Sequence, residues 1–104
     1  MSEDLVEASG RVLDAVVTSM GGSAREGQAS MVAEGAAALE AREHLLVQAG
    51  TGTGKSLGYL VPLLTHCAVS GVRGLVSTAT LALQRQILVK DAPVAVDAVA
   101  SATG

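Results

Sequence analysis

The apolar residues in the N-terminal part of the chain recur at helical spacing. Between Asp4 and Met20 they return every three or four residues, which predicts one helix with a broad apolar face. The two glycines that follow Met20 are expected to end this helix. A second amphipathic stretch predicts another helix, capped by Ser23 and running to about Arg42.

Two short apolar runs interrupt the helical pattern. They occupy residues 44–48 and 73–77, and each is followed by a glycine-rich or hydroxyl-rich segment. Short apolar runs bounded in this way are typical of strands that are buried on both faces of a parallel sheet. We therefore expect a strand at each of the two positions.

A helix is predicted after each expected strand. The first begins at about Gly54 and ends at Gly71, with a kink or a local break at Pro62, because proline lacks a backbone donor. The second runs from Thr80 to Lys90, and the Asp-Ala-Pro sequence that follows is expected to end it.

The predicted order of elements is helix, helix, strand, helix, strand, helix. This order is the beginning of an α/β fold, in which parallel strands are flanked by helices. Two strands alone leave backbone groups without partners along their edges, so the sheet is expected to be incomplete. The expected organisation is an N-terminal helix and turn over residues 1–24, followed by one larger unit over residues 25–104.

Composition limits the size and the activity of this fold. The 104 residues carry 7 basic and 10 acidic side chains, for a formal charge of −3, and 49% of them are apolar. One small domain is expected, with a core of Ala, Val and Leu, since Tyr59 is the only aromatic residue. Scattered basic residues and a single aromatic side chain argue against a self-sufficient nucleic-acid module.

The cellular setting follows from the cysteine count and from hydropathy. Cys67 is the only cysteine, which excludes an internal disulfide and any multi-cysteine metal cluster within this chain. The uncharged stretch over residues 56–72 is shorter and more polar than a bilayer span requires, and the acidic N-terminus lacks the features of an export leader. We expect a cytoplasmic protein without a membrane span.

The strongest chemical signal is a glycine-rich loop between the first expected strand and its helix. It consists of Ala49, Gly50, Thr51, Gly52, Thr53, Gly54, Lys55 and Ser56. The glycines let several N–H groups turn toward one point, and the start of a helix adds positive potential, which together favour phosphate. Lys55 is expected to bridge the terminal phosphates of a nucleotide, and Ser56 to supply a hydroxyl ligand for Mg²⁺.

A candidate base contact lies upstream of the loop, in the sequence Arg25-Glu26-Gly27-Gln28. A glutamine side chain can donate a hydrogen bond to adenine and accept one from it at the same time. Gln28 is therefore expected to select ATP over GTP. A lone glutamine is more often a solvated helix residue, and the distance from the loop favours the functional interpretation.

Candidate nucleic-acid contacts lie downstream, where the second expected strand meets its helix. Thr78, Thr80 and Gln84 stand at this junction. Hydroxyls, an amide and the N–H groups of a helix start could hold a nucleic-acid backbone without reading bases. The alternative is purely structural, with Thr78 or Thr80 capping the helix and Gln84 in solvent.

The chain resembles the start of a superfamily 2 DNA helicase of the DinG type, related to the XPD helicases, in three segments: REGQ, LLVQAGTGTGKSLGYLVPLL, and STATLALQRQIL followed by KDAP. The resemblance covers most of residues 25–93. The strict phosphate-loop pattern begins with glycine, and Ala49 in that place is the form found in the helicase branch of the P-loop enzymes. The loop alone indicates nucleotide binding, and its combination with the third segment is specific for the family.

The resemblance implies part of a RecA-like helicase motor domain, with ATP and Mg²⁺ as cofactors and single-stranded DNA as partner. It assigns base recognition to Gln28 with Arg25 nearby, phosphate binding to the loop, the Mg²⁺ contact to Ser56 and a single-strand contact to residues 78–84. The family couples ATP hydrolysis to 5′→3′ unwinding of DNA. Many members also hold a four-iron, four-sulfur cluster, for which this chain has no set of four cysteines.

Three functional hypotheses remain open on the sequence. The first is the N-terminal part of an ATP-dependent DNA helicase, inactive as an isolated chain because no D-E-x-H motif follows the loop. The second is another P-loop enzyme, which the loop alone would support. The third is a non-catalytic module that binds nucleotide or a partner through exposed strand edges.

Overall fold

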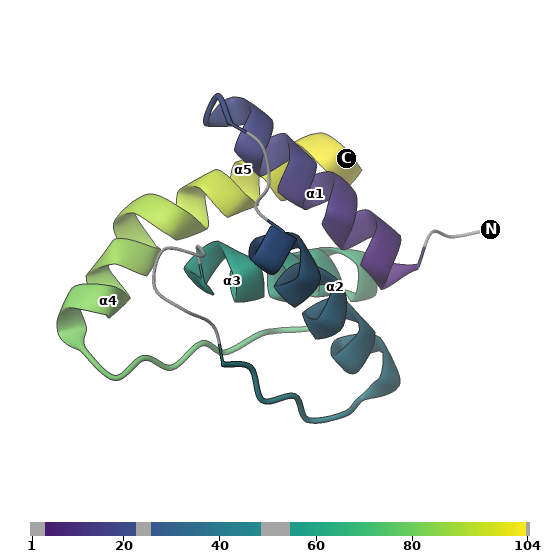
Figure 1. Ribbon diagram of the computed structural model, residues 1–104. Helices are drawn as coiled ribbons and strands as arrows, with labels where there is room; N and C mark the ends of the chain where they lie inside the picture. Colours follow the sequence, from purple (N-terminus) through teal and green to yellow (C-terminus); the bar gives the residue numbers. More distant parts are fainter. Residues whose placement is uncertain (1–3, 23–25, 49–54, 104) are drawn as a thin grey trace.

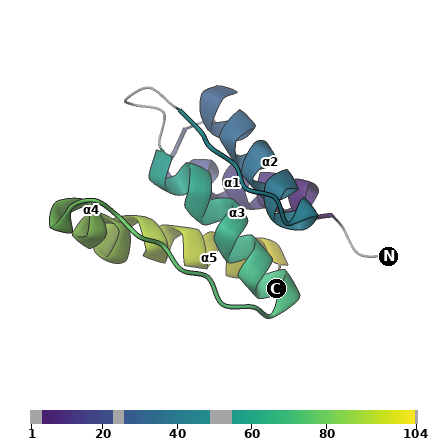
Figure 2. The same cartoon turned by 90° about the horizontal axis from the view of Figure 1, so that it is seen from below.

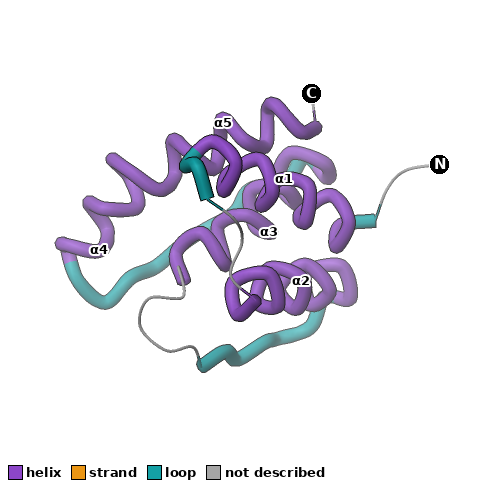
Figure 3. Tube along the Cα trace, turned by 45° about the horizontal axis from the view of Figure 1, so that its top comes forward, coloured by secondary structure: helices purple, strands orange, loops and turns teal. Residues whose placement is uncertain are grey.

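The computed structural model describes residues 4–22, 26–48 and 55–103 (Figure 1). The helices are α1 (Leu5–Ser19), α2 (Glu26–Ala41), α3 (Lys55–Ser70), α4 (Leu81–Gln86), the π-helical turn η1 (Ile87–Asp91) and α5 (Ala92–Thr103). Two segments without regular secondary structure, residues 43–48 and 71–80, join them, and Figure 3 shows no strand in the described part of the chain.

The first helix ends where the sequence predicts. The carboxylate of Asp4 accepts a hydrogen bond from the Glu7 N–H at 2.8 Å, which caps α1 at its start. At the other end Gly21 has a φ of 75°, and the Gly22 N–H donates to the Val17 carbonyl at 2.9 Å. Glycine adopts this left-handed conformation without steric cost, so the predicted boundary of α1 is confirmed.

The end of α2 uses the same geometry with a less suitable residue. Arg42 has a φ of 58°, its N–H donates to the Leu39 carbonyl at 3.2 Å, and the Glu43 N–H donates to the Ala38 carbonyl at 2.9 Å. These two bonds are the standard pair that closes a helix around a left-handed residue. A side chain at such a position crowds its own backbone, so Arg42 stores strain.

The core is built from aliphatic side chains at the contact of α1, α2, α3 and α5. Val12, Val16, Val32 and Val61 are at most 1% exposed, and Val99 of α5 packs in the same cluster. Two hydrogen bonds tie the ends of the elements together: Arg11 Nη1 donates to the Ala102 carbonyl at 2.6 Å, and the Leu5 N–H donates to a Glu40 carboxylate oxygen at 2.7 Å. The expected core of small aliphatic residues is confirmed.

α2 and α3 pack side by side with the same chain direction, as the contacts along them show (Figure 1). A Cβ atom built on Gly58 of α3 would lie 2.7 Å from the Met31 Sδ atom of α2. One turn further on, a Cβ atom built on Gly35 of α2 would lie 3.2 Å from Pro62 Cγ of α3. Each glycine therefore removes a side chain that would push the two helices apart.

Two expectations about the helical segments are corrected. The expected local break at Pro62 is absent, because α3 runs through Pro62 as one element, and the proline ring is buried against α2. The alternative expectation of a kink stays a prediction. The helical run after Thr80 does not end at Asp91 and Pro93, because it continues through η1 into α5. Pro93 lies in the first turn of α5, where a missing N–H costs little.

The predicted α/β fold with parallel strands is wrong for the part of the chain that the structure describes. Residues 44–48 and 73–77 are not strands. Leu46 is 99% exposed and Leu75 is 92% exposed, so neither run is buried on two faces. A strand exists only through pairing with another strand, and no ladder joins these two segments to each other or to any other described residue. Hydropathy showed that both runs are apolar, but it could not show whether another strand lies beside them to pair with.

The second of these segments is nevertheless fixed on α3. A Cβ atom built on Gly74 would lie 2.9 Å from Leu63 Cδ1 and 3.0 Å from Cys67 Sγ. The backbone at Gly74 therefore rests directly on two side chains of α3. This contact holds segment 71–80 against the helix that precedes it.

The described helices are too short or too polar to span a membrane. None of them, over residues 4–22, 26–48 and 55–103, has the length and apolar character needed to cross a bilayer.

Replacing Arg42 with glycine should stabilise the protein by about 1 kcal/mol, because the left-handed conformation then carries no steric cost. Chemical denaturation monitored by circular dichroism measures this change. The matched control is Gly21→Ala, which imposes the same strain on the end of α1 and should destabilise by about 1 kcal/mol. Loss of stability in Arg42→Gly would contradict the strain at this helix end.

Gly74→Val should lift segment 71–80 from α3, since the added side chain cannot occupy the space that Leu63 and Cys67 fill. The rate of Cys67 modification by a thiol reagent should then rise severalfold. Gly22→Val is the matched control, because a Cβ atom at Gly22 meets nothing within 4 Å. An unchanged modification rate in Gly74→Val would show that the segment is not held there.

Candidate functional site

Two of the predicted phosphate-binding residues, Lys55 and Ser56, lie at the start of α3. Lys55 is the first residue of this helix and is exposed, and Ser56 follows it half-buried. The first N–H groups of a helix have no partners within it and carry positive potential, so this end suits a phosphate group. The other loop residues, Ala49 to Gly54, lie outside the described residues.

Gln28 reaches the same end of the helix pair through the packing of α2 on α3. The Met31–Gly58 contact lies one turn before the Gly35–Pro62 contact on α2 and also on α3, so the two helices run in the same direction. Three residues before Met31 and Gly58 stand Gln28 and Lys55, so these two positions lie at the same height along the pair. Gln28 is buried, at 8% exposure, in the first turn of α2. Arg25, its predicted companion, lies outside the described residues.

Thr78, Thr80 and Gln84 gather in one turn at the start of α4. The Thr80 hydroxyl accepts a hydrogen bond from the Leu83 N–H at 3.1 Å and so caps α4. Thr78 donates through its hydroxyl to the Thr80 carbonyl at 3.1 Å, and Gln84 is exposed. The structural alternative therefore holds for the Thr80 side chain, and Gln84 is the side chain of this turn that is most open to a ligand.

A second apolar cluster connects this turn with α3. Leu60 of α3, Ile87 of η1 and Ala95 of α5 form its buried part. Tyr59, Val76 and Leu83 pack against them, so the residues on both sides of the Thr78–Thr80 turn are anchored to the helix that begins at Lys55. Tyr59 lies one helical turn after Lys55 on that helix.

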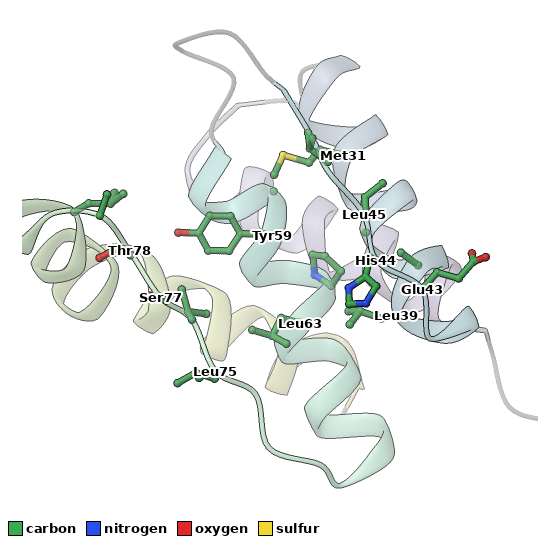
Figure 4. A pocket seen from close by; sticks show the side chains of 18 residues that line it. Met31, Leu39, Glu43, His44, Leu45, Tyr59, Leu63, Leu75, Ser77 and Thr78 are labelled. Atoms are coloured by element: carbon green, nitrogen blue, oxygen red, sulfur yellow. The ribbon is translucent and has the colours of Figure 1, made fainter.

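An apolar groove of about 660 Å³ separates the two connecting segments (Figure 4). Figure 2 shows both segments on the same face of the helices, and Figure 4 places Tyr59 and Leu63 between them. The groove is lined by α2, α3 and both segments, with Leu45 on one side and Leu75 and Thr78 on the other. Sequence reasoning missed it, because it predicted that both segments would be buried.

The donor set limits the metal chemistry that the described residues can support. No cluster of three or more His, Cys, Asp or Glu side chains suited to a metal ion occurs over residues 4–22, 26–48 and 55–103. The Ser56 hydroxyl fits Mg²⁺ as one hard oxygen ligand beside a phosphate, which is how this ion is commonly held. Cys67 is half-buried against Gly74, and a single thiol does not fit a four-cysteine iron–sulfur cluster.

Comparisons with known proteins place these features in a family. The family described as DEAD/DEAH box helicase matches residues 25–92. The chain is 47% identical over 102 residues to the ATP-dependent helicase DinG of Mycobacterium tuberculosis, covering 98% of this chain and 15% of that protein. It is 42% identical over 73 residues to the 3′-5′ exonuclease DinG of Bacillus subtilis, covering 70% of this chain and 8% of that protein.

A third relative agrees with these two. The chain is 42% identical over 74 residues to the ATP-dependent DNA helicase DinG of Photobacterium profundum, covering 66% of this chain and 11% of that protein. The chain thus spans about 15% of the length of the curated relatives that it matches over nearly all of its own residues. No solved structure matches it.

The resemblance to DinG-type helicases that the three sequence segments carry is confirmed by these matches. The family match begins at the segment that contains Gln28, includes the phosphate loop with Lys55 and Ser56, and extends past the α4 turn to residue 92. Because it covers more than half of the chain, the protein belongs to the DEAD/DEAH box helicase family.

Proposed function

We propose that this chain is the ATP-binding part of an ATP-dependent DNA helicase, in which hydrolysis of ATP drives 5′→3′ unwinding of duplex DNA. The observation that supports the proposal is that Gln28 and Lys55 lie at the same height at one end of the α2–α3 pair. In this proposal one nucleotide contacts both residues, with its base at Gln28 and its terminal phosphates at Lys55. Residues 25–104 then belong to the motor domain, which acts in the cytoplasm.

In this proposal the start of α3 binds the triphosphate. The Lys55 ammonium neutralises and orients the terminal phosphates, while the loop from Ala49 to Gly54 surrounds them with backbone N–H groups. Ser56 offers its hydroxyl to Mg²⁺, which supplies charge neutralisation at the phosphates when it is bound. The helix N-terminus holds the negative charge with dipoles that are already oriented, so little reorganisation is needed on binding.

The amide of Gln28 pairs with adenine in this proposal, with Arg25 close to the base. Its burial favours such a role, because a buried amide that meets adenine loses little further hydration. Guanine presents two acceptors on the same edge, so the amide oxygen of Gln28 would find no donor there. Single-stranded DNA is contacted by the turn of Thr78, Thr80 and Gln84. Because the Thr80 hydroxyl caps α4, its part there is to shape the turn.

Completion of the reaction needs groups that these 104 residues do not contain. No D-E-x-H sequence is present, so the carboxylates that complete Mg²⁺ binding and position the attacking water are missing from this chain. The isolated chain should therefore show no steady-state ATPase activity. Another P-loop enzyme and a non-catalytic nucleotide-binding module are the alternatives.

Lys55→Ala in the complete helicase should lower DNA-stimulated ATP turnover at least about a hundredfold, because the terminal phosphates lose their cation. A coupled assay of phosphate release, with and without single-stranded DNA, measures it. Lys90→Ala is the matched control, since Lys90 is exposed on η1 and should be replaceable without effect. Full turnover in Lys55→Ala would contradict the proposal, and turnover that DNA does not stimulate would favour a different P-loop enzyme.

Gln28→Ala in the complete helicase should lower the preference for ATP over GTP by about tenfold, the equivalent of one lost bidentate pair. The ratio of dissociation constants for the two nucleotides, measured by titration calorimetry, reports it. If the unaltered protein binds ATP and GTP equally well, base recognition by Gln28 has no basis.

A further inference from the structure

We propose that Gly58 is a positioning residue for the nucleotide base. By leaving space for Met31 on the surface of α3, it holds α2 at the height where Gln28 lies level with Lys55. The inference rests on the proposed function and deepens it, because it assigns part of the selectivity for adenine to a helix contact outside the phosphate loop.

The space at Gly58 is filled by one side chain. A Cβ atom at this position would lie 2.7 Å from Met31 Sδ, 3.3 Å from Met31 Cγ and 3.4 Å from Met31 Cε. All three atoms belong to the same thioether side chain of α2. Gly58 is buried, so a side chain placed on it would have to displace Met31 or α2 itself.

A second contact, between Gly35 and Pro62, fixes the register of α2 on α3 together with the Met31–Gly58 contact. A Cβ atom on Gly35 would lie 3.2 Å from Pro62 Cγ, and the proline ring cannot swing away as a methionine can. Val32 and Ala36, at 1% and 0% exposure, fill the rest of the same buried side of α2. α2 is thus seated on α3 at two points that are one turn apart.

The register matters for Gln28 because hydrogen bonds tolerate little displacement. A slip of one helical turn would move Gln28 by about 5.4 Å relative to Lys55, whereas a donor and acceptor must stay within a few tenths of an ångström of about 2.9 Å. A nucleotide with its phosphates at Lys55 would then no longer place its base against the Gln28 amide. Binding of the phosphates would persist, since they are held by α3 and the loop.

A small and a large side chain at Gly58 should have different effects on the preference for ATP. A Met31 side chain can adopt another rotamer to admit a single methyl group, so Gly58→Ala should leave the ratio of ATP to GTP affinity within about twofold. A leucine is too large for that adjustment and must shift α2. Gly58→Leu should therefore lower the preference for ATP by about tenfold, the same loss as in Gln28→Ala.

The experiment is titration calorimetry of the complete helicase with Mg-ATP and with Mg-GTP, in the Gly58→Leu variant and the unaltered protein. The ratio of the two dissociation constants does not depend on the fraction of protein that is folded, so a loss of stability alone does not move it. Gly10→Leu is the matched control, because Gly10 also lies within a helix but a Cβ atom there meets nothing within 4 Å. Its ratio should equal that of the unaltered protein.

Two more variants make the test decisive. Met31→Ala combined with Gly58→Leu exchanges the volumes of the two residues, and it should recover most of the preference for ATP. Gly58→Val, which adds less bulk, should show a smaller loss in the same direction and serves if Gly58→Leu does not fold.

An unchanged ratio in Gly58→Leu or in Gly58→Val, beside a lowered ratio in Gln28→Ala, would overturn the role of Gly58 while leaving the proposed function intact. No preference for ATP in the unaltered protein would instead overturn the proposed base recognition by Gln28, and the role of Gly58 with it.

Discussion

α2 and α3 approach each other closely because two glycines remove the side chains that would hold them apart. Gly58 admits Met31 and Gly35 admits Pro62, and the two contacts fix both the direction and the height of one helix on the other. α1 and α5 then close over the pair, with Val12, Val16 and Val61 at the centre of a core that contains no buried aromatic ring among the described residues. In such a core, close backbone packing supplies the contacts that large side chains would otherwise make.

The parallel packing of α2 on α3 also determines where the segments that follow these two helices lie. With α2 and α3 running in one direction, both connecting segments return along one face toward the starts of these helices (Figure 2). One leads toward the phosphate loop, and the other ends at the Thr80 cap of α4. An apolar groove lies between the two segments, and Leu46 and Leu75 are exposed beside it. No other described residue covers this apolar surface. The chain spans 8% to 15% of the length of the three relatives named above.

The sequence predicted the helix ends that are fixed by interactions within one turn of the chain. Asp4, Gly21 and Thr80 end or begin helices as expected, because caps act within one turn of the chain. The strands at 44–48 and 73–77 could not be decided in that way, since a strand depends on partners elsewhere. The proline at 93 also misled, because it is compatible with a first helical turn as well as with a helix end.

The candidate site shows the same division between local and distant information. Lys55 and Ser56 were identified by their motif, and their place at the start of a helix was expected from it. That Gln28 lies level with Lys55 depends on the register of two helices, which the motifs do not encode. The importance of Gly35 and Gly58 comes from their neighbours on another helix, which no local motif shows.

The most direct test of the account is nuclear magnetic resonance on the isotopically labelled protein, which measures proximity between α2 and α3. The packing predicts a strong cross-relaxation signal between the Met31 methyl group and the Gly58 Hα protons, together with one between the Gly35 Hα protons and the Pro62 ring. Signals from Met31 to a different turn of α3, or their absence from both pairs, would contradict the register on which the site depends.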